Sequence, residues 1–161
     1  MPKISLMENL DKLDHNILAI LMKDAELSYK DIASQLFVSP GTVHVRVKKM
    51  KELGIIKGTY IQVDYDKLGF DIAAFLGIYL DKSSLYDDVA EQLTKIPEVV
   101  GVHYTTGLYN IFAKIICKDT THLRQVLHDK IQNISGIQRT ETFISLQESI
   151  DRPLQILKQL P

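Results

Sequence analysis

Residues 39–50 read SPGTVHVRVKKM, and this stretch decides the fold of the first third of the chain. The hydroxyl of Ser39 is a good helix cap, and Pro40 stands at the first helical position, where its missing N–H costs nothing. Apolar residues then recur at helical spacing on one face: Val43, Val47 and Met50. The stretch therefore predicts a helix that packs through this face and stops at Gly54, a residue suited to a left-handed helix end.

The opposite face of the predicted helix is small and polar at its start and basic further along. Small and polar side chains can approach the edges of DNA bases, and lysines can meet phosphates. The alternative is an amphipathic helix whose lysines are merely solvated.

Two shorter helical segments precede this one. Asp11 caps the first, with Asp14 as its partner in a box-like arrangement, and Ser28 caps the second. Only Phe37-Val38 separates the second segment from residues 39–50, which leaves room for a tight turn. Two short helices joined by a tight turn, the second of them basic, predict a helix-turn-helix, and this context favours DNA contact over the solvated helix.

The charge distribution agrees with a local nucleic-acid contact. The chain has 161 residues and a net charge of −1, which excludes binding of polyanions by bulk charge. Residues 1–63 carry nine Lys and Arg against seven Asp and Glu. Within residues 36–58 the single acid is Glu52, and the basic residues are Arg46, Lys48, Lys49, Lys51 and Lys57. Basic charge is therefore concentrated in one short segment.

A small β wing is predicted after the basic helix. Gly58 marks a turn, and Tyr60 to Val63 is a β-prone run. Lys57 would touch a phosphate there, or would only keep the turn soluble. The predicted DNA-contacting residues are Ser39, Gly41, Thr42, His44, Val45, Lys48, Lys49 and Lys57.

The pattern changes after residues 64–69, a short polar linker that ends in glycine. The predicted division is 1–63, a linker of 64–69, and a second domain of 70–161. The second domain alternates predicted strands and helices in the order strand 71–81, helix 84–95, strands 98–105 and 109–118, helix 120–133 and strand 137–147. This α+β order, βαββαβ, predicts a ferredoxin-like sandwich.

Both faces of the predicted sheet are apolar. In the first strand Leu76 and Ile78 point to one side, while Phe75 and Tyr79 point to the other. Two helices cover only one face of a four-stranded sheet, and large exposed apolar patches are rare on monomers. A second copy of the sheet would cover the other face and give an isologous dimer. The competing explanation is that the N-terminal domain folds back onto the sheet.

Several classes of protein are excluded by absent patterns. The chain has no glycine-rich nucleotide loop, no metal-ligand spacing and no apolar run of membrane-spanning length. Its single cysteine, Cys117, lies in an apolar strand and is expected to be inert core. No signal peptide is expected from the charged first 20 residues, and a chain with one cysteine fits a reducing cytoplasm.

A polar loop and a threonine-rich strand form the second candidate site. The loop, residues 104–110, reads YTTGLYN and joins two predicted strands, and Gly107 would let backbone amides converge. The last strand places Gln138, Thr140 and Thr142 on one face. Together these groups suit a small polar zwitterion, whereas the alternative is a hairpin turn beside a threonine-rich edge strand. The predicted ligand-binding residues are Tyr104, Thr105, Thr106, Gly107, Asn110, Gln138, Thr140 and Thr142.

Residues 39–50, followed by Gly54-Ile55-Ile56, resemble the DNA-binding signature of the Lrp/AsnC, or feast/famine, transcription regulators. Residues Tyr104 to Gly107, Tyr109, and Thr140 to Thr142 resemble the ligand-binding half of that family. The resemblance covers the chain from about Leu10 to Pro153. It implies a winged helix-turn-helix followed by a regulator-of-amino-acid-metabolism (RAM) domain. It also implies dimers built through the sheets, which commonly assemble into octamers with an amino acid bound between dimers.

One departure from the family pattern concerns the effector. Many members follow the Thr-Gly loop with an acidic Gly-Asp-x-Asp stretch, but residues 107–110 here read GLYN. The similarity is greatest to asparagine-responsive members, and Asn110 or Gln138 would read a side-chain amide. Asparagine is thus the first candidate effector and glutamine the second, and another amino acid is a further alternative.

Two rival functions stay open at this stage. Some relatives of this architecture resemble sirohaem decarboxylases, which would make the chain an enzyme with His103 near a tetrapyrrole. Thr105, Thr106 and the intact basic helix favour a non-enzymatic regulator without metal or cofactor. The second rival is a ligand-sensing module with a vestigial helix-turn-helix.

Overall fold

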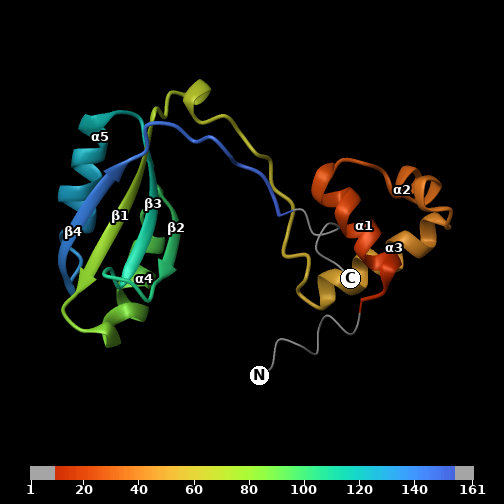
Figure 1. Cartoon of the computed structure of the whole chain (residues 1–161), viewed down its shortest axis with the longest axis horizontal. Coiled ribbons are helices and arrows are strands. Elements are labelled where there is room, and N and C mark those ends of the chain that lie inside the picture. The colour runs from red at the N-terminus through yellow and green to blue at the C-terminus, as the bar shows by residue number, and fades with distance from the viewer. Residues whose placement is uncertain (1–9, 155–161) are drawn as a thin grey trace. The chain divides into compact units, whose positions relative to one another are not determined.

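The computed structural model describes residues 10–154 and divides the chain into two compact units (Figure 1). The first unit consists of the chain up to Gln62 together with the C-terminal segment that begins at Ile150. The second unit is Val63–Ser149. The predicted second domain instead ran to residue 161, of which 155–161 lie outside the described residues. The side-chain amide of Gln62 donates a hydrogen bond to Asp151 at 2.7 Å, which ties the returning segment to the first unit.

Within its described residues the first unit has three helices, α1 (Lys12–Lys23), α2 (Tyr29–Leu36) and α3 (Pro40–Glu52). Each begins at the cap that the sequence predicts. Asp11 and Asp14 form a full capping box, and the hydroxyls of Ser28 and Ser39 accept backbone N–H bonds at 3.2 and 3.0 Å. After α3, Gly54 adopts a left-handed backbone with φ of 70°. The core of the unit consists of Ile17, Ile32, Ala33, Val43, Val47 and Met50.

The predicted β wing does not form as strands in this structure. Tyr60 is 91% exposed and Ile61 is also exposed, and no strand occurs within the described residues of the first unit, 10–62 and 150–154. A β-prone run needs backbone pairing with a neighbouring strand, and the returning segment instead contacts this run through the side chains of Gln62 and Asp151. The β propensity of Tyr60 to Val63 is therefore not sufficient to form a strand.

The second unit is a four-stranded antiparallel sheet in the order β2-β3-β1-β4. Its strands are β1 (Ile72–Leu80), β2 (Val99–Tyr104), β3 (Ile111–Cys117) and β4 (Ile137–Ile144). Two short 3-10 turns, η2 (Asp66–Leu68) and η3 (Ser83–Leu85), precede β1 and α4 (Tyr86–Thr94). The second crossover is α5 (Thr120–Gln125), which continues as a π-helical turn, η4 (Val126–Ile131). This is the predicted ferredoxin-like order.

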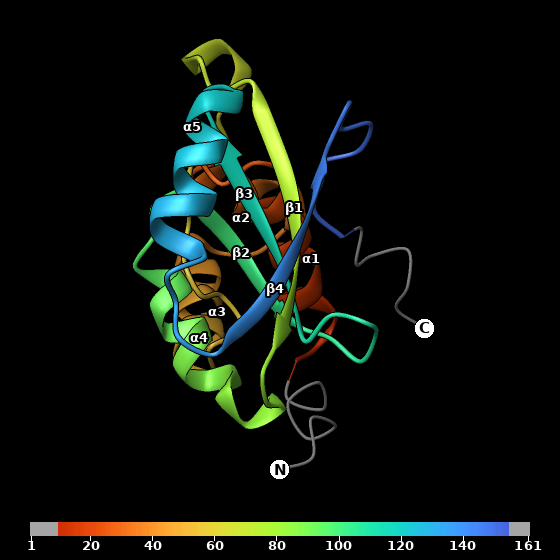
Figure 2. The same cartoon turned by 90° about the vertical axis from the view of Figure 1, so that its left-hand side faces the viewer.

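The two helices lie together on one face of the sheet (Figure 2). That face is the core, where Leu76 and Ile78 of β1 and Ile111 and Ile115 of β3 are fully buried. No helix within residues 10–154 is long and apolar enough to cross a membrane.

The face opposite the helices, here called the open face, carries an aromatic cluster. Phe75 and Phe112 stack with ring centroids 5.7 Å apart, and Phe143 joins them from β4 while staying 45% exposed. The strand alternation thus produces the second apolar surface that the sequence predicts.

Tyr109 closes over the open face at Gly77. A Cβ atom on Gly77 would lie only 2.5 Å from the ring of Tyr109, so the ring needs a residue without a side chain beneath it. The Tyr109 hydroxyl donates to Glu141 at 2.8 Å, and Tyr79 donates to the other carboxylate oxygen at 3.2 Å. Hydrogen bonding to the Glu141 carboxylate raises the pKa of Tyr109.

Replacing Gly77 with alanine is expected to displace the Tyr109 ring and break its bond to Glu141. Overpacking of this kind typically costs about 1–3 kcal/mol, measurable by urea denaturation. Gly101→Ala is the matched control, because a Cβ there meets its nearest atoms at 3.8 Å, an ordinary contact. Equal stability of the two variants would show that the ring adjusts at no cost.

Candidate nucleic-acid interface and ligand site

The face of α3 turned away from the core carries Gly41, Val45 and Lys48. Val45 is 64% exposed although it is apolar, and the Lys48 side chain is 69% exposed. Val43, Val47 and Met50 are buried on the other side. The division of faces is therefore the one that helical spacing predicts.

Two contacts hold the flanks of α3. On one flank, the His44 ring meets Tyr29 of α2 edge to face, with centroids 5.8 Å apart. On the other flank, Arg46 points to α1, where its Nη1 lies 3.0 Å from Oδ2 of Asp14 and also bonds the Asp11 carboxylate. The Asp14 side chain is 0% exposed. We call this group of Arg46, Asp11 and Asp14 the Arg46 clamp.

In the Arg46 clamp, a cation compensates a buried carboxylate. A buried carboxylate is costly unless a cation and hydrogen bonds compensate it, and Arg46 supplies both to Asp14. The Asp14 amide and the Arg46 guanidinium hold the pKa of Asp11 below its usual value. Arg46 was counted in the basic segment by sequence, but here it faces inward and serves the fold. The signal that could have revealed this is an acid at position 14 on the apolar stripe of the first helix.

Ser39 and Thr42 serve the helix end rather than standing free. The Ser39 hydroxyl accepts the Thr42 N–H at 3.0 Å, and the two hydroxyls lie 2.9 Å apart. The first turn of α3 contains no acid, so the positive end of the helix dipole stays unneutralised at this point. An anion such as a phosphate is favoured there. Lys49 and Lys57 are also exposed.

The predicted ligand residues fall into two groups, a loop group within residues 104–110 and a strand group on β4. The register places Tyr104 beside Ile111, Ile111 beside Ile78, and Ile78 beside Thr140, so these four residues form one row across the sheet. Three strand spacings separate Tyr104 from Thr140, or about 14 Å. Tyr104 and Thr140 of one copy are therefore too far apart to bind one small molecule together, whereas Asn110 of the loop lies beside Leu80, whose partner on β4 is Ile137.

The loop group is held by its own hydrogen bonds. The Thr105 hydroxyl donates to the Tyr109 carbonyl, and the Asn110 side chain accepts the Leu80 N–H at 2.9 Å while donating to Ser83 at 3.2 Å. The Asn110 amide thus anchors the loop to the end of β1. Gly107 lies outside the left-handed region, and a Cβ there would meet nothing within 4 Å.

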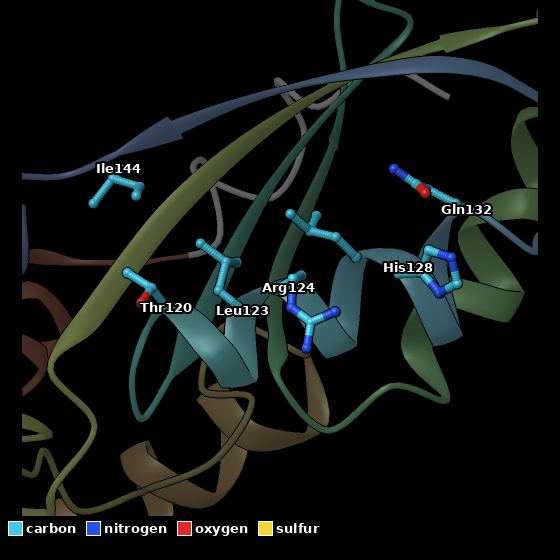
Figure 3. Close-up of a pocket in the computed structure, with 7 residues that line it drawn as sticks. Thr120, Leu123, Arg124, His128, Gln132 and Ile144 are labelled. Carbon is cyan, nitrogen blue, oxygen red and sulfur yellow. The ribbon is translucent and has the colours of Figure 1, made fainter.

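The strand group lines a cleft. Gln138 and Thr140 border a volume of about 350 Å³ together with Gln132, Ile137 and Arg139. Thr142 lies further along β4, opposite Leu76. A second hollow of about 310 Å³ is lined by Thr120, Leu123 and Arg124 of α5 and by Ile144 of β4 (Figure 3). Amide and hydroxyl groups at the first cleft match the hydrogen-bonding groups of a small polar molecule.

The chain matches two family models that divide it as the structure does. Residues 10–57 match the winged helix-turn-helix DNA-binding model, and residues 73–155 match the Lrp/AsnC ligand binding domain. The chain is 47% identical over 149 residues to the regulatory protein AsnC of Haemophilus influenzae, covering 92% of this chain and 99% of the relative.

The chain belongs to the Lrp/AsnC family.

Solved structures agree with this membership. The structure of Escherichia coli AsnC superposes with a TM-score of 0.85 at 44% identity, covering 91% of this chain and 98% of that one. A transcriptional regulator of Neisseria meningitidis in complex with L-methionine shares the fold, with a TM-score of 0.84 at 22% identity over 92% and 99% of the two chains.

This Lrp/AsnC chain is a transcriptional regulator with a DNA-binding and an amino-acid-binding domain, and it is not an enzyme. Its relatives are named as regulators, which removes the decarboxylase alternative. Cys117 is buried, and burial raises the pKa of its thiol to about 11, as expected of an inert core cysteine. Residues 10–154 contain no cluster of three or more side chains able to hold a metal ion.

Replacing Arg46 with alanine is expected to destabilise the helical unit by about 3 kcal/mol, because Asp14 would remain buried without its cation. The double variant Arg46→Met with Asp14→Leu removes both charges and should recover most of that loss. Chemical denaturation monitored by far-ultraviolet circular dichroism measures both. If the double variant is no more stable than the single one, the ion pair is not what holds α1 to α3.

Proposed function

We propose that this Lrp/AsnC regulator binds double-stranded DNA through the exposed face of α3 and that asparagine controls its assembly and operator affinity. The DNA-binding part of this proposal rests on the exposed face of α3. That face presents small and apolar residues near the start of the helix and lysines beyond them. In a helix-turn-helix the N-terminal part of the second helix contacts base edges. Gly41, Thr42, His44 and Val45 take that place here, and Lys48, Lys49 and Lys57 contact phosphates.

Dimers would present two such helices to an operator with two-fold symmetry, with half-sites about one helical turn or a multiple apart. The open face of the sheet supports this, because its aromatic cluster would be covered by the open face of a second copy. Higher assembly, up to an octamer, would present several pairs of helices. A DNA-binding role also places the chain in the cytoplasm.

Replacing Lys48 with alanine should weaken binding to all DNA sequences alike. The slope of log K against log salt concentration should become shallower by about 1, because one phosphate contact and its released counterion are lost. Fluorescence anisotropy with a duplex selected from a random library by the wild-type chain measures both quantities.

Lys95→Ala provides the matched control for this experiment. Lys95 is similarly exposed and also pairs with a glutamate four residues away, but it lies in the sheet unit. A slope that Lys48→Ala leaves unchanged would remove this residue from the interface.

The effector proposal rests on the cleft at β4 and on the AsnC relatives. Gln138 is exposed at the cleft and has amide groups that pair with the amide of asparagine. Thr140 supplies a hydroxyl beside it. The loop residues Tyr104, Thr105, Thr106 and Gly107 would come from another copy, since Tyr104 and Thr140 of one copy lie three strand spacings apart. This would link ligand binding to assembly, because the complete site exists only between copies.

Calorimetric titration with the twenty amino acids is expected to give the strongest heat with asparagine. Thr140→Val keeps the side-chain shape and removes the hydroxyl, so asparagine affinity should fall roughly tenfold, the effect of one lost hydrogen bond. DNA binding without asparagine should not change. Thr94→Val is the control, because the Thr94 hydroxyl bonds only within its own helix region, to the Glu91 carbonyl. Full asparagine affinity in Thr140→Val would remove β4 from the ligand site.

A further inference from the structure

Phe37 is an outlier in both backbone and burial. It occupies the turn between α2 and α3 with φ of 55°, and it is the one non-glycine residue with positive φ among residues 10–154. Its side chain is 96% exposed. Glycine or asparagine fits such a helix end without strain, whereas a bulky side chain there is strained.

The turn geometry explains why the ring points outward. Val38 stands just before the Ser39 cap, and Val43 is the fourth residue of α3, which are the two positions of a hydrophobic staple. Val43 belongs to the core of the first unit, and Val38 is partly buried against that core. Because Val38 must face inward, its neighbour Phe37 faces solvent. The turn therefore depends on the backbone conformation of Phe37, while the exposed ring adds little packing to the unit.

Strain at an exposed aromatic residue points to a function outside the fold. Phe37 lies two residues before the cap of α3, so its Cα is within about 8 Å of the Cα of Ser39. The same end of α3 lacks acidic residues and presents Gly41 and Val45 to solvent. The exposed ring therefore lies a few residues along the chain from the end of α3 whose exposed face is proposed to contact DNA.

We propose that Phe37 is a DNA contact, with its ring packed against the apolar part of the duplex beside the half-site, the deoxyribose and thymine methyl groups. Apolar side chains are suited to thymine methyl groups, and a ring at this edge would lose its exposed surface on binding. The proposal rests on the proposed use of α3 in DNA binding and extends that contact surface to the turn.

Replacing Phe37 with glycine tests the proposal through two effects of opposite sign. The variant should be more stable than the wild type, with a higher urea midpoint, because glycine removes the backbone strain. Its affinity for the library-selected duplex should nevertheless fall roughly tenfold, or about 1.4 kcal/mol. The slope against salt concentration should stay that of the wild type, because no phosphate contact is lost.

Two further variants complete the test. Phe37→Ala keeps a side chain at the strained position but lacks the ring, so its affinity should fall as in Phe37→Gly, whereas a role limited to the backbone would leave it at the wild-type value. Leu146→Ala removes an equally exposed apolar side chain from the sheet unit and should leave DNA affinity unchanged.

Several outcomes would overturn the proposal. Wild-type affinity in Phe37→Gly would show that the ring does not touch DNA. A reduced urea midpoint would show that the ring supports the fold. A change of mass by sedimentation velocity in Phe37→Gly would make Phe37 a contact between copies of the chain. If the wild-type chain selects no duplex from the library, the proposed DNA binding through α3 fails as well.

Discussion

The ion pair between Arg46 and the buried Asp14 fixes how α3 is rotated against α1. Asp14 is fully buried, and a carboxylate in that position needs a cation at hydrogen-bonding distance. Since Arg46 is the cation, the helix cannot turn by one residue without leaving the charge unpaired. The rotation then determines the rest of the surface, because residues about 180° from the clamp and core must point to solvent. Val45 and Lys48 are exposed for this reason.

A second constraint acts on the sheet unit. Two helices cover one face, and the open face keeps an aromatic cluster anchored by Tyr109 over Gly77. The same geometry divides the polar groups, since the row from Tyr104 to Thr140 runs across all four strands. A small molecule that contacts both Tyr104 and Thr140 would therefore need two copies. In the proposed function, covering the open face and completing the ligand site would both favour assembly, for independent physical reasons.

Local sequence signals predicted most of the fold. Caps at Asp11, Ser28 and Ser39 and the apolar spacing of α3 act within a few residues, so the sequence shows them directly. The strands of the second unit likewise lie within the predicted ranges. Interactions between residues far apart in the sequence are harder to predict. Arg46 and Asp14 are 32 residues apart, and a charged residue on a basic helix is expected to face solvent. The same limit applies to Asn110, which suited a ligand by residue type but is bonded to the end of β1 and to Ser83.

These constraints bear on how an effector would control DNA binding in the proposed function. Within its unit α3 is held by the Arg46 clamp, by the staple of Val38 and Val43, and by the His44 contact to Tyr29. A ligand bound on the sheet unit has no means to reshape a helix fixed by three separate contacts without breaking them. In the proposed function it would instead change the free energy of assembly, because its contacts would come from different copies. Regulation would then act on how many recognition helices are joined and at what spacing, while the surface of each helix stays the same.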